Sequence, residues 1–477
     1  MLPHRMPLGV GSADVFDHER LRRLERWEIA LAQAQLDSPG ALPRDREAAL
    51  RWALGLMRAR EADGIALEEP LARFREELGR TLAPIFEDGE VDLEAAALLA
   101  PVVAARTEAE LERLERLPVD RAGIEEEIRQ KKLVLALGGG GGSAWAHLGA
   151  FALLEDEGIR PALVAGASMG AVLGLLRARS TVYDSGEVFH SVRSLSLSRL
   201  FGPSTEAGHY GLPAALRLNL LESIPWPEAA GLRLGDLPIP LVVTLSGVRR
   251  EDLPRPPSFY QRLLPANLFR RPRLLPRSLK SLVEAASELI RARSLVPIRV
   301  GTGGFTADLH PLDAVGFSCA LPGVIQYEPI PGPDGRNSLL DRLLWENEVG
   351  WLLDGGLTEN VPAKAAWLAV QEGAIGERNA LILALDGFSP RLSSGLWMPL
   401  QRIAQENVRR SLEYAHAVVT YSRTLSPTEI LPSINGLIRA IDLGRSQLAH
   451  QMPLIRKLTS PLPPLPNVAS ARVKIAV

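Results

Sequence analysis

The chain has 477 residues, 46% hydrophobic and 23% charged, which is the composition of a folded globular protein of two or three domains. Its 54 basic and 56 acidic residues leave a net charge of -2, which excludes the overall basic field that drives non-specific nucleic-acid binding. The single cysteine, Cys319, excludes an internal disulfide and a cysteine-rich zinc site. We expect no metal, no cofactor and no nucleic-acid partner.

The longest uncharged stretch, Leu133 to Leu154, contains five consecutive glycines and His147, which make it a poor transmembrane helix. The first ten residues contain no apolar segment of the length of a secretory signal. We therefore expect a cytoplasmic protein, with any membrane contact being peripheral.

Residues 1–130 are predicted to form a helical N-terminal module. Apolar residues recur three or four positions apart in two runs: Leu21, Leu24, Trp27 and Leu31, then Leu111, Leu114 and Leu117. Thr107 and Glu110 predict a capping box for the second run. Turn residues at 38–40 and 88–89 divide the module into several helices.

Residues 131–390 are predicted to form an α/β core with a mostly parallel central sheet flanked by helices. Short, wholly apolar runs, typical of buried parallel strands, occur at 133–137, 163–165, 241–243 and 381–385. Segments of helical length follow the first two runs, at 144–154 and 171–179. Residues 391–477 are predicted to be a helical extension, with a helix from Trp397 to about Tyr421 and a Pro-rich tail at 461–466.

The segment Gly166 to Gly170 has the pattern G-x-S-x-G, with Ser168 at its centre. It lies between a predicted strand and a predicted helix, as a nucleophile elbow requires, because the sharp turn lifts the serine hydroxyl clear of the sheet. The backbone N–H of Met169 would then face a developing oxyanion. The alternative is a glycine-rich turn with a capping serine.

Five glycines, Gly138 to Gly142, end the first predicted strand. Consecutive glycines can direct several backbone N–H groups into one concavity, which suits a phosphate or an oxyanion. A P-loop is excluded because no Gly-Lys-Ser/Thr follows. The spacing Gly139-x-Gly141-x-x-Ala144 matches a dinucleotide fingerprint, but no acid follows the next predicted strand to bind a ribose.

An acyl-transfer serine needs a base, and Asp354 is the candidate, because it ends a short apolar run and is followed by two glycines. Asp-Gly-Gly is also typical of a simple turn. Only His416 and His450 follow Asp354, and His416 falls in a predicted helix. A Ser168–Asp354 dyad is therefore favoured, and a triad with His416 stays open.

The chain resembles the patatin-like phospholipases, a family of serine lipid acyl hydrolases with a Ser-Asp dyad on an α/β fold. Ordered matching blocks run from Leu135 to Pro362, at 135–141, 146–149, 166–170, 237–243, 318–324 and 354–362. The resemblance implies a phospholipase or lysophospholipase that cleaves lipid esters through an acyl-enzyme. It implies Ser168 as nucleophile, Asp354 as base and the backbone of Gly139, Gly140 and Gly141 as oxyanion hole.

The chain departs from the family after the glycine run, where Ser143 and Ala144 replace a basic residue and a glycine. The missing cation predicts weaker recognition of a phosphate headgroup. A catalytically weak or silent lipid-binding or scaffold protein is therefore an alternative. His147 matches a family position, but as a lone histidine in an apolar helix it is predicted to be structural.

Residues 249–280 contain nine basic and two acidic residues among aromatic and aliphatic ones. Such a segment predicts peripheral contact with an anionic lipid surface. The alternative is an irregular, solvated loop over the core. The oligomeric state is not predicted.

Overall fold

The computed structural model describes residues 12–62, 64–204, 208–223, 231–262, 285, 288–289, 294–330, 337–387 and 407–465. The chain divides into two compact units, one of residues 1–132 with 452–477 and one of residues 133–451. None of the helices in these described ranges is both long and apolar enough to cross a membrane.

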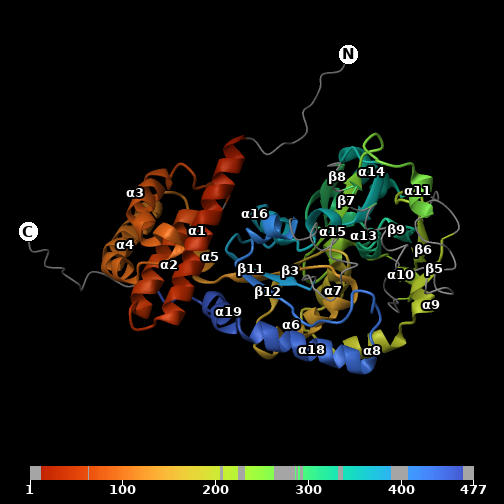
Figure 1. The fold of residues 1–477 in the computed structure, drawn as a ribbon. Coiled ribbons are helices and arrows are strands. Elements are labelled where there is room, and N and C mark those ends of the chain that lie inside the picture. Colours follow the sequence, from red (N-terminus) through yellow and green to blue (C-terminus); the bar gives the residue numbers. More distant parts are fainter. Residues whose placement is uncertain are drawn as a thin grey trace, which may run out of the picture. The chain divides into compact units, whose positions relative to one another are not determined.

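The first unit is helical, and the helices expected there are present (Figure 1). Its elements are α1 (Ser12–Asp37), α2 (Arg44–Arg58), α3 (Ala72–Leu82), α4 (Leu93–Leu114), α5 (Arg121–Arg129) and α19 (Met452–Thr459), with a hairpin of β1 (Glu61–Ala62) and β2 (Ile65–Ala66). Its core consists of fully buried apolar side chains from α1, α2 and α4, among them Leu31, Leu54 and Val103. The unit therefore has its own hydrophobic core.

The predicted capping box at Thr107 is wrong. Thr107 lies inside α4, and its hydroxyl donates to the carbonyl of Val103 (2.8 Å). The cap is Asp92, whose carboxylate accepts the N–H of Ala95 (2.9 Å). The alanine- and leucine-rich stretch between these residues favours helix, and α4 continues through Pro101, so the second run belongs to a helix that begins earlier.

The second unit contains a seven-stranded sheet in the order β10-β7-β4-β3-β11-β12, with β8 also paired to β7. The predicted apolar runs are confirmed as β3 (Lys132–Leu137), β4 (Pro161–Gly166), β7 (Leu241–Val248) and β11 (Ala380–Asp386). The pairs β3–β4, β4–β7 and β11–β12 are parallel, whereas β8 (Leu295–Val300) and β10 (Trp351–Asp354) run antiparallel to β7. The expected α/β class with a mostly parallel central sheet is confirmed.

Helices flank this sheet. A short 3-10 helix over Gly141–Ala146 leads into α6 (His147–Asp156), and the others near the site are α7 (Met169–Ala178), α13 (Pro311–Ser318), α15 (Gly356–Glu359) and α16 (Ala363–Gln371). Further helices are α8 (Ser185–Ser194), α9 (Leu197–Leu200), α10 (Leu220–Ser223), α11 (Pro257–Gln261) and α14 (Ser338–Glu346). A small second sheet of β5 (Phe201–Pro203), β6 (Ala214–Leu218) and β9 (Gly323–Tyr327) has no counterpart among the predicted elements.

The C-terminal region differs from its prediction. The helix expected from Trp397 to Tyr421 lies outside the described residues over 397–406, and it is wrong over β12 (Ala417–Thr420), which pairs with β11. Two adjacent valines and a threonine favour a strand there. Helix α18 (Ile434–Ala449) belongs to the second unit, whereas α19 and the start of the Pro-rich tail belong to the first. Of the basic stretch 249–280, residues 263–280 lie outside the described residues.

Helices α6 and α18 pack with their backbones in contact, side by side in Figure 1. A Cβ added to Gly444 would lie 1.9 Å from the carbonyl oxygen of Ala146, and one added to Gly149 would lie 2.0 Å from that of Ile441. Glycine is therefore required on both helices. This contact supports α6, the helix that follows the glycine run.

We predict that Gly444→Ala lowers the free energy of unfolding by about 1–3 kcal/mol, because the methyl group forces the two backbones apart. Thermal and denaturant unfolding followed by circular dichroism measure the change. Gly231→Ala is the matched control, since no atom lies within 4 Å of its added Cβ. Equal losses in the two variants would contradict this account of the packing.

Candidate active site

Ser168 lies on the sharp turn between β4 and α7, with φ 52° and ψ -128°. This region is unfavourable for a non-glycine residue, and such strain persists only where the surroundings impose it. The N–H of Ser168 donates to the hydroxyl of Ser318 (2.8 Å), which in turn donates to the carbonyl of Thr244 (2.8 Å). A Cβ on Gly170 would lie 2.2 Å from the carbonyl oxygen of Leu137, so the turn also needs a glycine there.

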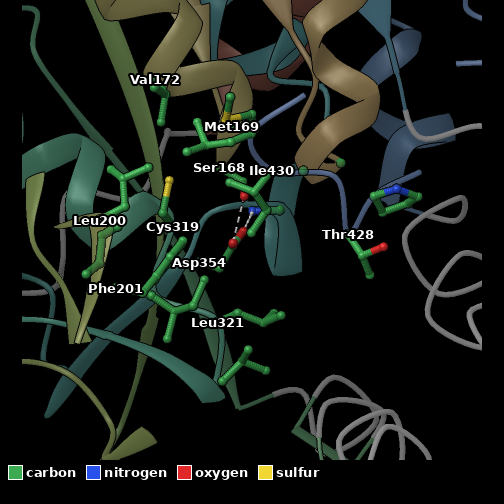
Figure 2. Close-up of a pocket in the computed structure, with 18 of the residues that line it drawn as sticks. Ser168, Met169, Val172, Leu200, Phe201, Cys319, Leu321, Asp354, Thr428 and Ile430 are labelled. Carbon is green, nitrogen blue, oxygen red and sulfur yellow. Dashed lines mark hydrogen bonds between the residues drawn. The ribbon is translucent and has the colours of Figure 1, made fainter. Parts of the chain in front are cut away.

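The register of the sheet brings Asp354 to this turn. β8 pairs along one edge of β7, and β4 and β10 share the other edge, where Gly166 pairs with Val243 and Asp354 pairs with Leu245. The end of β4 and the end of β10 therefore meet only two positions apart along this shared edge. The hydroxyl of Ser168 donates to Oδ2 of Asp354 at 2.8 Å, across 186 residues of sequence (Figure 2).

Asp354 is 7% exposed, and burial raises the pKa of its carboxyl group to about 6. Hydrogen bonds from Ser168 and from the N–H of Gly356 (2.8 Å, to Oδ1) lower that pKa but do not cancel the effect of burial. The N–H of Asp354 donates to the carbonyl of Ala320 (2.9 Å), which fixes the end of the strand. The carboxyl group is thus held in place with a pKa near the range of a general base.

The glycine run divides into two parts. The N–H of Gly138 donates to Leu385 (2.9 Å) and that of Gly139 to the carbonyl of Asn360 (3.1 Å), so Gly139 is committed within the fold. Gly140 and Gly141 have φ angles of 130° and 57°, a conformation that glycine adopts without strain. Gly140, Gly141 and Met169 line the same cavity as Ser168.

Two polar side chains form hydrogen bonds with carbonyl groups of the glycine run. The hydroxyl of Ser143 donates to the carbonyl of Gly140 (2.8 Å) and is buried. Nε2 of His147 lies 2.9 Å from the carbonyl oxygen of Gly138, which requires Nε2 to carry the proton. Burial lowers the pKa of His147 to about 4, so the ring is neutral. Both side chains face the loop backbone, which is the structural role expected of His147.

Ser168 and Asp354 line an apolar cavity of about 340 Å3. Figure 2 shows Leu200 and Phe201 on one side of the pair and Thr428 on the other. No lysine, arginine or histidine lines this cavity within the described ranges. Its walls come largely from aliphatic and aromatic side chains, including Trp145, Val172, Leu195, Leu218, Leu321 and Ile430. Such a lining suits a hydrocarbon chain.

Three further residues at the site had no predicted role. Ser318 anchors the elbow, as described above, and Cys319 lines the cavity with a thiol whose pKa is raised by burial and by Asp354. Asn360 also lines the cavity, and its buried Nδ2 has no hydrogen-bond partner among the described residues. All three lie in the blocks 318–324 and 354–362 that carry the family resemblance, which is the only signal in the sequence that singles them out.

The histidines considered for a triad lie in other surroundings. Nδ1 of His416 accepts the N–H of Ile382 (3.0 Å), and the N–H of His416 donates back to the carbonyl of Ile382 (2.9 Å). His450 is exposed at the end of α18. Neither histidine lines the cavity. No set of three or more metal-ligating side chains is gathered in the part of the chain that the structure describes.

We predict that Asp354→Asn changes how stability depends on pH. A carboxyl group whose pKa is higher in the folded than in the unfolded state stabilises the folded protein at pH values below its unfolded-state pKa. This stabilisation is lost as the pH rises through the folded-state pKa of about 6. A rise in this pKa from the usual 3.8 to about 6 corresponds to a loss of about 3 kcal/mol of stability. The variant should therefore gain stability relative to the natural chain as the pH rises from about 4 to about 6, and the difference should level off above that range.

Denaturant unfolding at several pH values measures this difference, with Asp442→Asn at an exposed position as the control. A difference between Asp354→Asn and the natural chain that stays constant with pH would contradict the assigned burial effect.

Similarity to known proteins covers part of the chain. Residues 135–367 match the family model described as patatin-like phospholipase. Over 109 residues the chain is 33% identical to uncharacterized NTE family proteins from Mycobacterium tuberculosis and Mycobacterium bovis. That match covers 23% of this chain and 29% of each relative.

Proposed function

Because residues 135–367 belong to the patatin-like phospholipases, we propose that this protein is a lipid acyl hydrolase that uses Ser168 as nucleophile and Asp354 as general base. The observation that carries the proposal is the 2.8 Å hydrogen bond from the Ser168 hydroxyl to the Asp354 carboxylate, at an apolar cavity. The substrate is a carboxylic ester of a lipid, as in a phospholipase or lysophospholipase.

In the acylation step, Oγ of Ser168 attacks the ester carbonyl carbon while Oδ2 of Asp354 takes the hydroxyl proton. The backbone N–H groups of Gly140, Gly141 and Met169 stabilise the oxyanion, whereas Gly139 contributes through loop geometry because its N–H is already bonded. Protonated Asp354 then gives its proton to the leaving alcohol oxygen as the carbon–oxygen bond breaks. The acyl group remains on Ser168.

In the deacylation step, a water molecule occupies the space that the alcohol leaves. Asp354 takes a proton from this water, which attacks the acyl carbonyl carbon and forms a second oxyanion in the same hole. Collapse of that intermediate releases the carboxylic acid and returns the proton from Asp354 to Ser168. A carboxylate can serve both steps without histidine because burial brings its pKa close to neutral.

We predict that Ser168→Ala abolishes hydrolysis of lipid esters, with a loss of at least about 10³-fold, because no other group in the site carries the acyl chain. Labelling with a fluorophosphonate probe should be lost together with activity. Ser194→Ala, at an exposed serine, should keep both. Hydrolysis that persists in Ser168→Ala would refute the assignment, and a natural chain that neither reacts with the probe nor turns over would favour the silent lipid-binding alternative.

We predict that kcat/KM rises about tenfold per pH unit up to about pH 6 and is then constant, because Asp354 must be ionised in the free enzyme. Asp354→Asn should remove this dependence along with most of the rate. His416→Ala should retain the same pH profile as the natural chain. Loss of activity in His416→Ala, in a folded protein, would support the triad instead.

A further inference from the structure

Two short segments of the second unit line the cavity with residues that are only partly buried. Thr428, in the second segment, is the one exposed residue among the described lining residues, which places the mouth of the cavity there. On one side are Leu195 and Phe201, which flank α9, and on the other are Ile430 and Leu431, which precede α18. Figure 2 shows Phe201 and Thr428 on opposite sides of Ser168.

Both segments continue into exposed aliphatic side chains. Leu197, on α9, is 54% exposed, and Ile434 and Ile438, one turn apart at the start of α18, are 49% and 43% exposed. None of the three lines the cavity. They follow the lining residues of the same two segments closely in sequence, and about half of each side chain is exposed to solvent.

Cations accompany these aliphatic side chains. Arg193 and Arg199 flank Leu197 within a segment, 189–201, that has no acidic residue, and Arg439 follows Ile438. All three arginines are exposed, and the structure shows none of them paired with a described acid. Exposed aliphatic groups beside free cations are the pattern of a surface that meets anionic lipid headgroups.

We propose that a pocket rim, consisting of Leu197, Ile434 and Ile438 with Arg193, Arg199 and Arg439, docks the protein on an anionic lipid surface. The inference rests on the proposed function and adds how a water-insoluble substrate reaches Ser168. The aliphatic side chains insert below the headgroups while the arginines contact phosphates. An acyl chain then passes from the lipid into the cavity along a continuous apolar wall, without crossing water.

Binding to vesicles of phosphatidylcholine, with and without phosphatidylserine, tests the rim by co-sedimentation. The aliphatic variant Leu197→Asn/Ile434→Asn/Ile438→Asn should bind at least about tenfold more weakly to both kinds of vesicle. The cationic variant Arg193→Gln/Arg199→Gln/Arg439→Gln should lose the increase in vesicle affinity that phosphatidylserine gives. Each arginine near an anionic surface raises that affinity about fivefold. Thermal unfolding confirms that each variant is folded.

Helix α4 of the first unit offers a matched control. Its Leu98 and Val102 are 70% and 47% exposed and one turn apart, as Ile434 and Ile438 are, but they belong to a different unit from the cavity. Leu98→Asn/Val102→Asn should therefore bind vesicles as the natural chain does. Loss of binding in this control equal to that in the aliphatic variant would overturn the proposal.

The variant Ser168→Ala distinguishes vesicle binding from catalysis, because it should bind vesicles as the natural chain does but hydrolyse no lipid ester. In the aliphatic variant, the ratio of turnover on vesicle lipid to turnover on a dissolved short-chain ester should fall at least about tenfold. Unchanged vesicle binding in the aliphatic variant would overturn the rim. A natural chain that dimerises, with the aliphatic variant monomeric and neither binding vesicles, would instead assign the surface to a second copy.

Discussion

The site depends on strand β7, because β7 holds both halves of the Ser168–Asp354 pair. β4 lies parallel and β10 antiparallel along the same edge of β7, opposite β8, and the two registers end within two positions of each other. A slip of one residue in either register would turn the affected side chains to the other face of the sheet. The carboxylate would then leave the hydroxyl, so the placement of two side chains 186 residues apart is a property of the sheet.

Hydrogen bonds compensate for the backbone strain of Ser168 and for the burial of Asp354. Ser168 keeps an unfavourable φ because its N–H donates to the hydroxyl of Ser318, which is itself fixed by the carbonyl of Thr244. Asp354 stays buried because the N–H of Gly356 donates to its second oxygen. In the described part of the site, no charged partner compensates for the backbone strain of Ser168 or for the burial of the Asp354 carboxyl group. Preorganised dipoles in an apolar cavity act strongly on developing charge, which is how the proposed Ser168–Asp354 dyad would work without a cation.

Much of this arrangement could be predicted from local sequence patterns. The wholly apolar runs identified four strands, because only buried parallel strands tolerate such runs, and the G-x-S-x-G pattern between strand and helix located the elbow. Asp354 could be placed at a strand end, but nothing in its neighbourhood indicated that β10 runs antiparallel to β7.

Other features depend on distant contacts that no local pattern records. The sequence does not show which of Gly139, Gly140 and Gly141 has a free N–H group. The structure shows that the N–H of Gly139 is bonded to the carbonyl of Asn360. The strand β12 was predicted as helix because Leu412, Ala415 and Val419 have the spacing of one helical face, and pairing with β11 decides for a strand. The three-stranded sheet that walls the cavity consists of short strands without a distinctive pattern.

The chain leaves its first unit after Lys132 and returns to it at Met452. Lys457 contacts Gln35 (2.8 Å) and forms an ion pair with Glu47 (3.2 Å), and the carbonyl of Pro463 accepts the indole N–H of Trp52 (2.8 Å). During synthesis on the ribosome, α19 and the tail therefore emerge only after the whole second unit has been made. The first unit completes these contacts last, although helices α1 to α5 are made before any part of the second unit.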